Sequence, residues 1–207
     1  MNILTIDTSD SYDSLTLYDS EKGILADLSF SIPKLQSEGL IDILKVLFEG
    51  SKFSLKDIDI VGVCIGPGSY TGTRIGIASA MGISEGSKAQ CYGVSSLEIQ
   101  AYSLKNEKRE IVSFKEIRDN QFFYGRYKIV DGELLVLEKD RKISRDSFVD
   151  YISSCRREVA FVGEGELDPS FEVQPIDKSL TKSLLMSKIL ANCRKKESRR
   201  SMDLLYL

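Results

Sequence analysis

The chain has 207 residues, and 42% of them are hydrophobic, which is enough for the core of one large domain or two small ones. Its 28 Lys and Arg residues against 31 Asp and Glu residues give a formal net charge of -3, so nothing in the total charge favours nucleic-acid binding. The absence of histidine excludes Ser-His-Asp and Cys-His nucleophile systems and HExxH zinc sites. Any chemistry would have to use carboxylates, hydroxyls, lysine or backbone amides.

The first residues, MNILTIDTSD, have no basic segment and meet Asp7 after a short apolar run, so we expect a first strand rather than a signal peptide. No segment approaches the roughly 20 apolar residues of a membrane span, and we expect a cytoplasmic protein. The four cysteines lie far apart and predict reduced thiols rather than a zinc site or disulfides: Cys64, Cys91, Cys155 and Cys193.

The first half of the chain predicts three strands followed by alternating helices and strands. NILTID, LTLYD and ILADLSFSI have the pattern of a β-meander, and the next helix, at residues 37–50, is apolar over more than one face. The apolar run at 58–65 predicts a strand buried on both faces. A helix at 71–86 and the segment YGVSSLEIQAYSL, a strand and a helix, complete the order βββαβαβα through residue 105.

The second half predicts a hairpin, a helix, a strand and a terminal helix. EIVSF is a strand, and FFYGRYKIV and ELLVLE flank Asp131-Gly132, a strong hairpin signal. SRDSFVDYISSC predicts a helix, VAFVGEG a strand, and 178–196 a long helix that the basic residues 194–200 end. We therefore expect two α/β lobes that join near residue 105, with 1–105 as the first domain and 106–207 as the second.

The segment GPGSYTGTRIG, residues 66–76, lies between the buried strand and the next helix. A strand, a glycine-rich turn and a helix can direct N–H groups and the positive end of a helix at a phosphate. The spacing matches neither a Walker loop nor a Rossmann loop, which would need glycine at Thr71. The spacing instead favours a structural turn, in which Gly66 and Gly68 adopt unusual φ angles and Ser69 or Thr71 caps the helix.

Small residues recur at every fourth position of the helix that follows this turn. Gly72, Gly76, Ala80 and Ser84 form a ridge on one face, which would let another element approach closely. The ridge predicts either tight packing within the chain or, together with the second apolar face of the 38–49 helix, a surface for a partner protein.

Four segments, ILTIDTS, QSEGL, IGPGSYTGTRIGIASAMGI and YGVSSLE, closely resemble the TsaB family, also called YeaZ, over residues 1–100. The resemblance implies an actin-like ATPase fold (ASKHA, RNase H-like), with two lobes that each hold a mixed sheet flanked by helices. It also implies a non-catalytic subunit in the synthesis of threonylcarbamoyladenosine on the tRNA adenosine next to the anticodon. In this interpretation the chain holds no catalytic residue and no metal.

The resemblance also implies partners. TsaD-like enzymes transfer the threonylcarbamoyl group and hold a metal with histidines, which this chain lacks, so it resembles neither that enzyme nor the metalloprotease of older family labels. We expect a TsaD-like catalytic partner, a TsaE-like ATPase, and contact with tRNA only through the complex. A homodimer in the absence of TsaD is a further alternative. Binding of ATP or ADP at the partner interface is left open.

Two sets of residues follow from the resemblance. The first set matches the positions of the phosphate-binding loops of actin-like ATPases. It is either a remnant of these loops without a ligand or part of a nucleotide site: Asp7, Thr8, Gly66, Gly68, Ser69, Thr71 and Gly72. The second comes from 37–50 and 71–86 and would contact TsaD: Leu40, Ile41, Leu44, Phe48, Gly72, Ile75, Gly76, Ser79, Ala80 and Ile83. The alternative function is a stand-alone ATP-binding hydrolase or kinase that uses Asp7 and the glycine turn.

The chain departs from the family pattern at three places. Gln36 stands where the family has histidine, Glu116-Ile117-Arg118 where it has Asp-Ala-Arg, and Gln121 where Glu is common. We expect Glu116 and Arg118 to form a surface ion pair. The departures at 116–121 predict that the second lobe has diverged.

Overall fold

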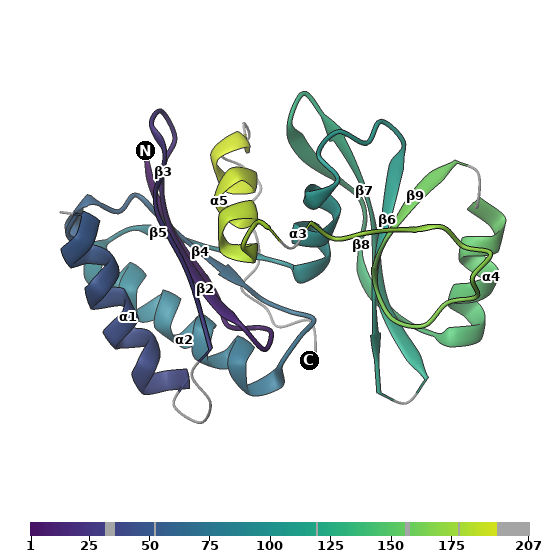
Figure 1. The fold of residues 1–207 in the computed structure, drawn as a ribbon, viewed down its shortest axis with the longest axis horizontal. Helices are drawn as coiled ribbons and strands as arrows, with labels where there is room; N and C mark the ends of the chain where they lie inside the picture. Colours follow the sequence, from purple (N-terminus) through teal and green to yellow (C-terminus); the bar gives the residue numbers. More distant parts are fainter. Residues whose placement is uncertain (32–35, 52, 119, 156–157, 178, 194–207) are drawn as a thin grey trace. The chain divides into compact units, whose positions relative to one another are not determined.

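The computed structural model contains two five-stranded mixed β-sheets, each flanked by helices (Figure 1). It describes residues 1–31, 36–51, 53–118, 120–155, 158–177 and 179–193. Two compact units hold one sheet each: the first unit comprises Met1–Ser96 together with the segment from Ser179 onward, and the second comprises Leu97–Lys178.

The first sheet has the order β3-β2-β1-β4-β5. Its meander consists of β1 (Asn2–Asp7), β2 (Asp13–Asp19) and β3 (Gly23–Phe30), which pair antiparallel. On the other side of β1, β4 (Ile60–Cys64) and β5 (Gln90–Val94) pair parallel. Because β1 and β4 are parallel neighbours, the loops that follow them emerge at the same edge of the sheet.

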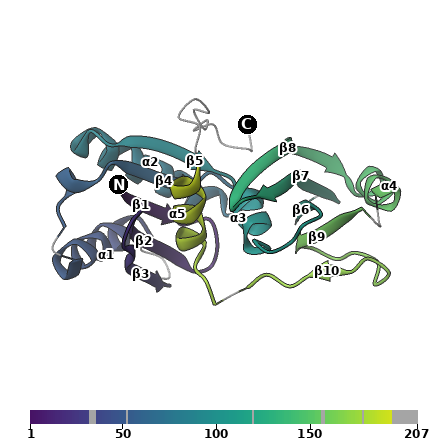
Figure 2. The same cartoon turned by 90° about the horizontal axis from the view of Figure 1, so that it is seen from above.

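Helices cover both faces of this sheet (Figures 1 and 2). On one face lie α1 (Gln36–Ser51) and α2 (Tyr70–Ser87), with the short η1 (Leu55–Asp57) between them in the chain, and on the other face lies α5 (Lys182–Asn192). Alternate strand residues pack against α1 and α2 in a fully apolar core that includes Leu4, Ile6, Leu15, Leu17, Val61 and Val63 from the sheet and Leu40, Leu44, Leu47 and Ala80 from the helices.

The face toward α5 carries a network of buried hydroxyl groups. The Thr5 and Ser187 hydroxyls lie 2.7 Å apart, as do the hydroxyls of Thr16 and Ser183. Asp27 accepts hydrogen bonds from both Thr16, at 2.6 Å, and Thr181, the N-cap of α5, at 2.7 Å. Because these groups are satisfied only in one register, the network fixes the position of α5 on the sheet.

The second sheet has the order β10-β9-β6-β7-β8. Its strands are β6 (Glu110–Ile117), β7 (Gln121–Val130), β8 (Glu133–Ser144), β9 (Val159–Glu164) and β10 (Val173–Gln174). A core of aromatic side chains packs between one face and α4 (Arg145–Cys155), with Phe148 stacked on Phe122 at 4.7 Å between ring centroids. On the other face, α3 (Ser96–Ser103) contacts β6, where Ser113 donates to Gln100 at 3.0 Å.

The element order predicted from the sequence is confirmed, including the hairpin turn at Asp131 and Gly132, whose φ angles are 52° and 81°. The short β10 was not predicted, and α1 begins at Gln36, one residue before the predicted start at residue 37. The terminal helix is shorter than 178–196, and the basic residues 194–200 lie outside the described residues.

The compact units differ from the domain division expected at residue 105. The chain enters the second unit at Leu97 and returns to the first with α5. The physical reason is the apolar face of α5: Leu184, Met186 and Leu190 are buried, and a Cβ on Gly62 of β4 would collide with Leu190. The terminal helix therefore completes the core of the first lobe.

Candidate functional site

Two loops meet at the carboxyl edge of the first sheet, one after β1 and one after β4. The loop after β1 carries Thr8 and Ser9, and the turn after β4 leads into α2. The Ser69 N–H donates to the carbonyl oxygen of Ser9 at 2.7 Å, and the Thr8 hydroxyl donates to the carbonyl oxygen of Gly72 at 2.6 Å. The two loops are thus bonded directly to each other.

The glycines of the turn are explained by this close approach. A Cβ on Gly68 would collide with the carbonyl oxygen of Ser9, and one on Gly72 with the carbonyl oxygen of Thr8. A Cβ on Gly76, one turn further along α2, would collide with the Thr8 hydroxyl. Gly66 has a φ of 91°, a conformation that favours glycine, and its peptide bond to Pro67 is cis.

The first N–H groups of α2 are also engaged within the chain. Ser69 is the N-cap, and its hydroxyl accepts from the Gly72 N–H at 3.2 Å, while its carbonyl oxygen accepts from the Thr73 N–H at 2.9 Å. Of the two capping residues that the sequence allowed, Ser69 is the cap and Thr71 is exposed. The backbone of Thr8 and Ser9 therefore lies in the space beside the glycines of the turn.

Asp7 lies beneath this pair of loops and is 1% exposed. Its Oδ1 accepts hydrogen bonds from the Ser9 N–H at 3.1 Å and the Ser9 hydroxyl at 2.6 Å. Asp13, at the start of β2, is 2% exposed, and its Oδ1 has no hydrogen-bond partner within the described residues. Burial, together with the charge of Asp7, raises the pKa of Asp13 to about 6. Sequence reasoning missed Asp13.

Lys182, the first residue of α5, supplies the positive charge beside these carboxylates. Its Nζ lies 2.6 Å from Oδ2 of Asp10. Burial disfavours the charged form, but the negative charges of Asp7 and Asp10 outweigh it and raise the pKa of Lys182. The nearby thiol of Cys64 donates to Ser9 at 3.3 Å, and burial raises its pKa to about 12, so it is protonated and is not a nucleophile at neutral pH.

The structure buries half of the residues expected at a partner interface. Leu40, Leu44, Gly72, Gly76 and Ala80 are buried and face the interior of the first unit, Phe48, Ile75, Ser79 and Ile83 are half-buried, and Ile41 is exposed. The small-residue ridge on α2 is therefore an internal packing feature, because Gly72 and Gly76 make room for the loop after β1. Of the two alternatives left open by the ridge, tight internal packing is the one observed.

The outward faces of α1 and α2 expose Ile41 from the expected set together with three apolar groups outside it, and we call these four residues the helix-pair surface: Ile41, Tyr70, Ala78 and Met81. Ile41 is 46% exposed, and Met81 is 56% exposed. Tyr70 is also 56% exposed, and the Arg74 guanidinium lies 3.8 Å from the centre of its ring. Tyr70 and Met81 are eleven residues apart, close to three helical turns, so they lie on the same face of α2. This spacing could have indicated the surface from the sequence.

In the second unit, the expected ion pair between Glu116 and Arg118 does not form. Glu116 pairs with Arg145 at the start of α4 and accepts from the Glu166 N–H at 2.9 Å, whereas Arg118 is exposed. Arg145 also donates to the side chain of Asn120 at 2.7 Å. The hydrogen bond from Glu166, together with Arg145, lowers the pKa of Glu116. Glu116 therefore holds the start of α4 to the end of β6, a structural role that the sequence separation concealed.

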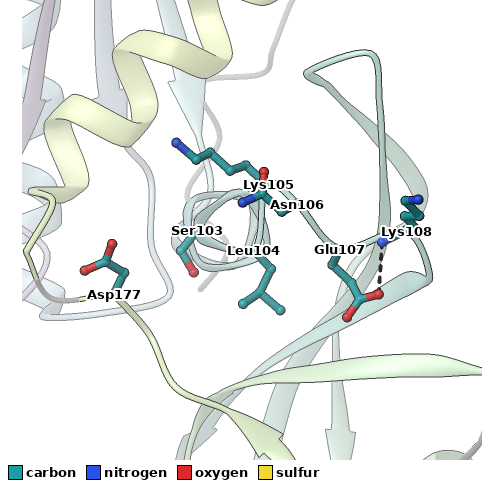
Figure 3. A pocket seen from close by; sticks show the side chains of 7 residues that line it. All are labelled: Ser103, Leu104, Lys105, Asn106, Glu107, Lys108 and Asp177. Atoms are coloured by element: carbon teal, nitrogen blue, oxygen red, sulfur yellow. Dashed lines mark hydrogen bonds between the residues drawn. The ribbon is translucent and has the colours of Figure 1, made fainter.

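A pocket of about 610 Å³ in the second unit is lined by Ser103–Lys108 and Asp177 (Figure 3). The Lys108 N–H donates to Glu107 at 2.9 Å, and the Arg109 guanidinium lies 2.8 Å from the same carboxylate. Hydrogen bonds from Arg109 lower the pKa of Glu107 to about 2. The lining carries charges of both signs, so the pocket defines no particular ligand.

Within the described residues, no three His, Cys, Asp or Glu side chains are grouped so that they could hold a metal ion. Nor does any helix in this part of the chain have the length and apolarity needed to cross a membrane.

The two mixed sheets with their helices define a class of protein, the actin-like two-lobe α/β fold. Two solved structures share it. YeaZ from Pseudomonas aeruginosa has 23% sequence identity and a TM-score of 0.60, over 70% of this chain and 68% of that one. A protein described as similar to peptidase YeaZ from P. aeruginosa has 22% identity and a TM-score of 0.61, over 78% and 74% of the two chains.

Sequence comparison narrows this class to one family. The family model described as TsaD, tRNA N6-adenosine threonylcarbamoyltransferase, matches residues 32–164. The proteins named tRNA threonylcarbamoyladenosine biosynthesis protein TsaB from Buchnera aphidicola (Schizaphis graminum) and Bacillus subtilis are 28% and 27% identical, over 79% and 87% of this chain and 78% and 77% of their own lengths. The chain belongs to this family, within its TsaB/YeaZ group.

Proposed function

We propose that the chain is a subunit in the synthesis of threonylcarbamoyladenosine on tRNA, and that it pairs with a TsaD-like catalytic enzyme without catalysing the transfer itself. The family and the names of the TsaB relatives support the pathway. Features of this chain support the pairing and the lack of catalysis.

The closed contact between the two loops is the observation that carries the non-catalytic role. The carbonyl oxygens of Thr8 and Ser9 take the space beside Gly72 and Gly68 where a phosphate would have to lie. The buried thiol of Cys64 is protonated, and the chain has no histidine. The site therefore has neither an imidazole nor a thiolate to act as base or nucleophile, and its carboxylates, Asp7 and Asp13, are buried.

The helix-pair surface is the surface we assign to the TsaD-like partner. Ile41 and Met81 expose large apolar side chains on neighbouring helices, an arrangement that suits the apolar face of a partner helix. This assignment replaces the ridge of Gly76 and Ala80, since a long charged residue there would disturb the core of the first unit rather than a contact.

A TsaE-like ATPase and tRNA complete the proposed assembly. The net charge of -3 gives this chain no general attraction to the tRNA backbone, so we propose that tRNA is bound through the partner proteins.

The test of the function is the threonylcarbamoyladenosine content of tRNA, measured by mass spectrometry of its nucleosides after reconstitution of the partner proteins with and without this chain. The modified nucleoside should form only when the chain is present. Equal product in both reactions would contradict the subunit role. Turnover of ATP by the purified chain alone, lost in Asp7→Asn, would support a stand-alone hydrolase instead.

The test of the surface is co-purification of the TsaD-like enzyme with charged variants. Ile41→Glu and Met81→Lys should each lose the partner while their circular dichroism spectra stay unchanged. Ile24→Lys is the matched control, because Ile24 is 52% exposed but lies on β3. If Ile41→Glu and Met81→Lys retain the partner as Ile24→Lys does, the contact lies elsewhere.

A further inference from the structure

A group of charged side chains beneath the two loops of the candidate site is not used by the proposed function. Its cation is Lys182, whose side chain is 20% exposed and whose Nζ lies 2.6 Å from Oδ2 of Asp10. Although burial disfavours the charged form, the negative charges of Asp7 and Asp10 raise the pKa of Lys182, so it is charged at neutral pH. A buried charge of this kind is strongly dependent on its partners, and they on it.

Both of these carboxylates hold the loop between β1 and β2, residues 8–12. Asp10 belongs to the loop itself. Asp7, the last residue of β1, accepts hydrogen bonds from the N–H and the hydroxyl of Ser9, at 3.1 Å and 2.6 Å. One lysine therefore balances the two negative charges that hold this loop, and it lies 172 positions after Asp10 in the chain.

The loop in turn holds the first turn of α2. The carbonyl oxygen of Ser9 accepts from the N–H of Ser69, the N-cap of α2, at 2.7 Å. The hydroxyl of Thr8 donates to the carbonyl oxygen of Gly72 at 2.6 Å. These two bonds lie on either side of Tyr70, an exposed residue of the helix-pair surface. A displacement of the loop would therefore displace Tyr70 as well.

The helix that carries Lys182 is fixed by other contacts. Its N-cap, Thr181, donates to Asp27 at 2.7 Å, and the Ser183 hydroxyl lies 2.7 Å from that of Thr16. The buried residues of α5, among them Leu184, pack against the first sheet. Because these contacts do not involve the ion pair, Lys182 is a fixed point, and its charge acts on the loop.

We propose that Lys182 is a positioning residue for the partner-binding end of α2: it holds the loop after β1 through Asp7 and Asp10, and this loop holds the turn that carries Tyr70. This role rests on the proposed function, because it concerns the surface assigned to the TsaD-like partner. Without the charge of Lys182, the two carboxylates would repel each other in a buried place, and the loop would move away from α2.

Amide exchange of the isolated chain, measured by NMR, tests the coupling without any partner. In Lys182→Met the Ser69 N–H should exchange about tenfold faster than in the wild type, because a hydrogen bond between charged groups is lost. The Asp59 N–H, which donates to Asn2 at the other end of β1 at 2.9 Å, should exchange at the same rate. Lys188→Met is the matched control, since Lys188 is half-buried later in the same helix.

Asp10→Asn makes the same test from the side of the loop and should also accelerate exchange of the Ser69 N–H. If neither Lys182→Met nor Asp10→Asn accelerates it beyond Lys188→Met, the loop does not depend on the ion pair and the proposal is wrong. Equal acceleration of the Ser69 and Asp59 N–H groups would also overturn it, because the substitution would then act on the stability of the whole unit.

The affinity for the TsaD-like enzyme, measured by isothermal titration calorimetry, tests the consequence for the surface. Lys182→Met should raise the dissociation constant about threefold or more, whereas Lys182→Arg, which keeps the charge, should bind as the wild type does. A Lys182→Met chain that binds as tightly as the wild type would overturn the positioning role. If the wild-type chain itself does not bind the enzyme, the proposed function fails, and exchange of the Ser69 N–H alone then decides whether Lys182 positions α2.

Discussion

Three glycines of α2 allow a sharp test of the closed loop contact. Alanine at Gly72 would place its Cβ against the carbonyl oxygen of Thr8, and at Gly76 against the Thr8 hydroxyl, whereas at Gly82 it would meet nothing within 4 Å. All three positions lie in the same helix, so the intrinsic effect of replacing glycine by alanine is comparable at each. Only the surroundings of the three positions differ. The series therefore isolates the cost of opening the contact.

The expected order follows from what each Cβ would displace. Alanine in place of glycine stabilises a helix interior by about 1 kcal/mol, and this should be the whole effect of Gly82→Ala. Overpacking costs about 1 to 3 kcal/mol. At Gly76 the obstacle is a side chain that can rotate, so we expect a net loss of about 1 kcal/mol. At Gly72 it is backbone, and the net loss should be about 2 kcal/mol or more.

The assay is urea unfolding followed by circular dichroism, since the chain has no tryptophan. The midpoint should rise for Gly82→Ala and fall for Gly76→Ala and further for Gly72→Ala. If Gly72→Ala unfolds at the same urea concentration as Gly82→Ala, the loop after β1 does not occupy the space beside the turn, and a phosphate site there becomes open to consideration again.

Three further predictions concern buried polar groups. The pKa of Asp13 is raised from 3.8 to about 6, so the stability that its protonated form contributes is present below pH 3.8 and is lost as the pH rises through 6. The change in the free energy of unfolding caused by Asp13→Asn should therefore be more favourable at pH 7.5 than at pH 3.5, by about 1 to 3 kcal/mol. Equal effects of the substitution at both pH values in urea unfolding would contradict this. Arg145→Ala removes the bonds to Glu116, Asn120 and the Glu166 carbonyl oxygen and should lower the free energy of unfolding by about 1 to 3 kcal/mol, while the exposed control Arg118→Ala should change it by less than about 0.5 kcal/mol. Thr16→Val keeps the shape of the side chain but leaves Asp27 and Ser183 with fewer partners, so it should cost about 1 to 3 kcal/mol, whereas a midpoint like that of the wild type would show that the hydroxyl network adds no stability.

The alternation of strands and helices could be predicted from the sequence because it depends on local periodicity. The apolar run at Ile60–Cys64, the Asp131-Gly132 turn and the Ser69 cap are all local signals, and the structure confirms them. The two lobes with mixed sheets followed from the order of these elements together with the family resemblance.

The residues against which a side-chain pattern packs could not be predicted in the same way. The ridge of Gly72 and Gly76 is clear in the sequence, but the residue that fills the space beside it, Thr8, lies 64 positions earlier than Gly72. The partner of Glu116 is 29 residues away rather than two. Such choices depend on which loops the sheet brings together, and this is a property of the tertiary structure.

The return of α5 to the first unit has a consequence for the synthesis of the protein. The second unit is continuous in the chain, so all of its residues are synthesised before α5. Thr5 and Thr16 of the first unit lack the hydroxyl groups of Ser187 and Ser183 until α5 emerges. Although translation proceeds from the first lobe to the second, the second lobe is thus able to finish folding first.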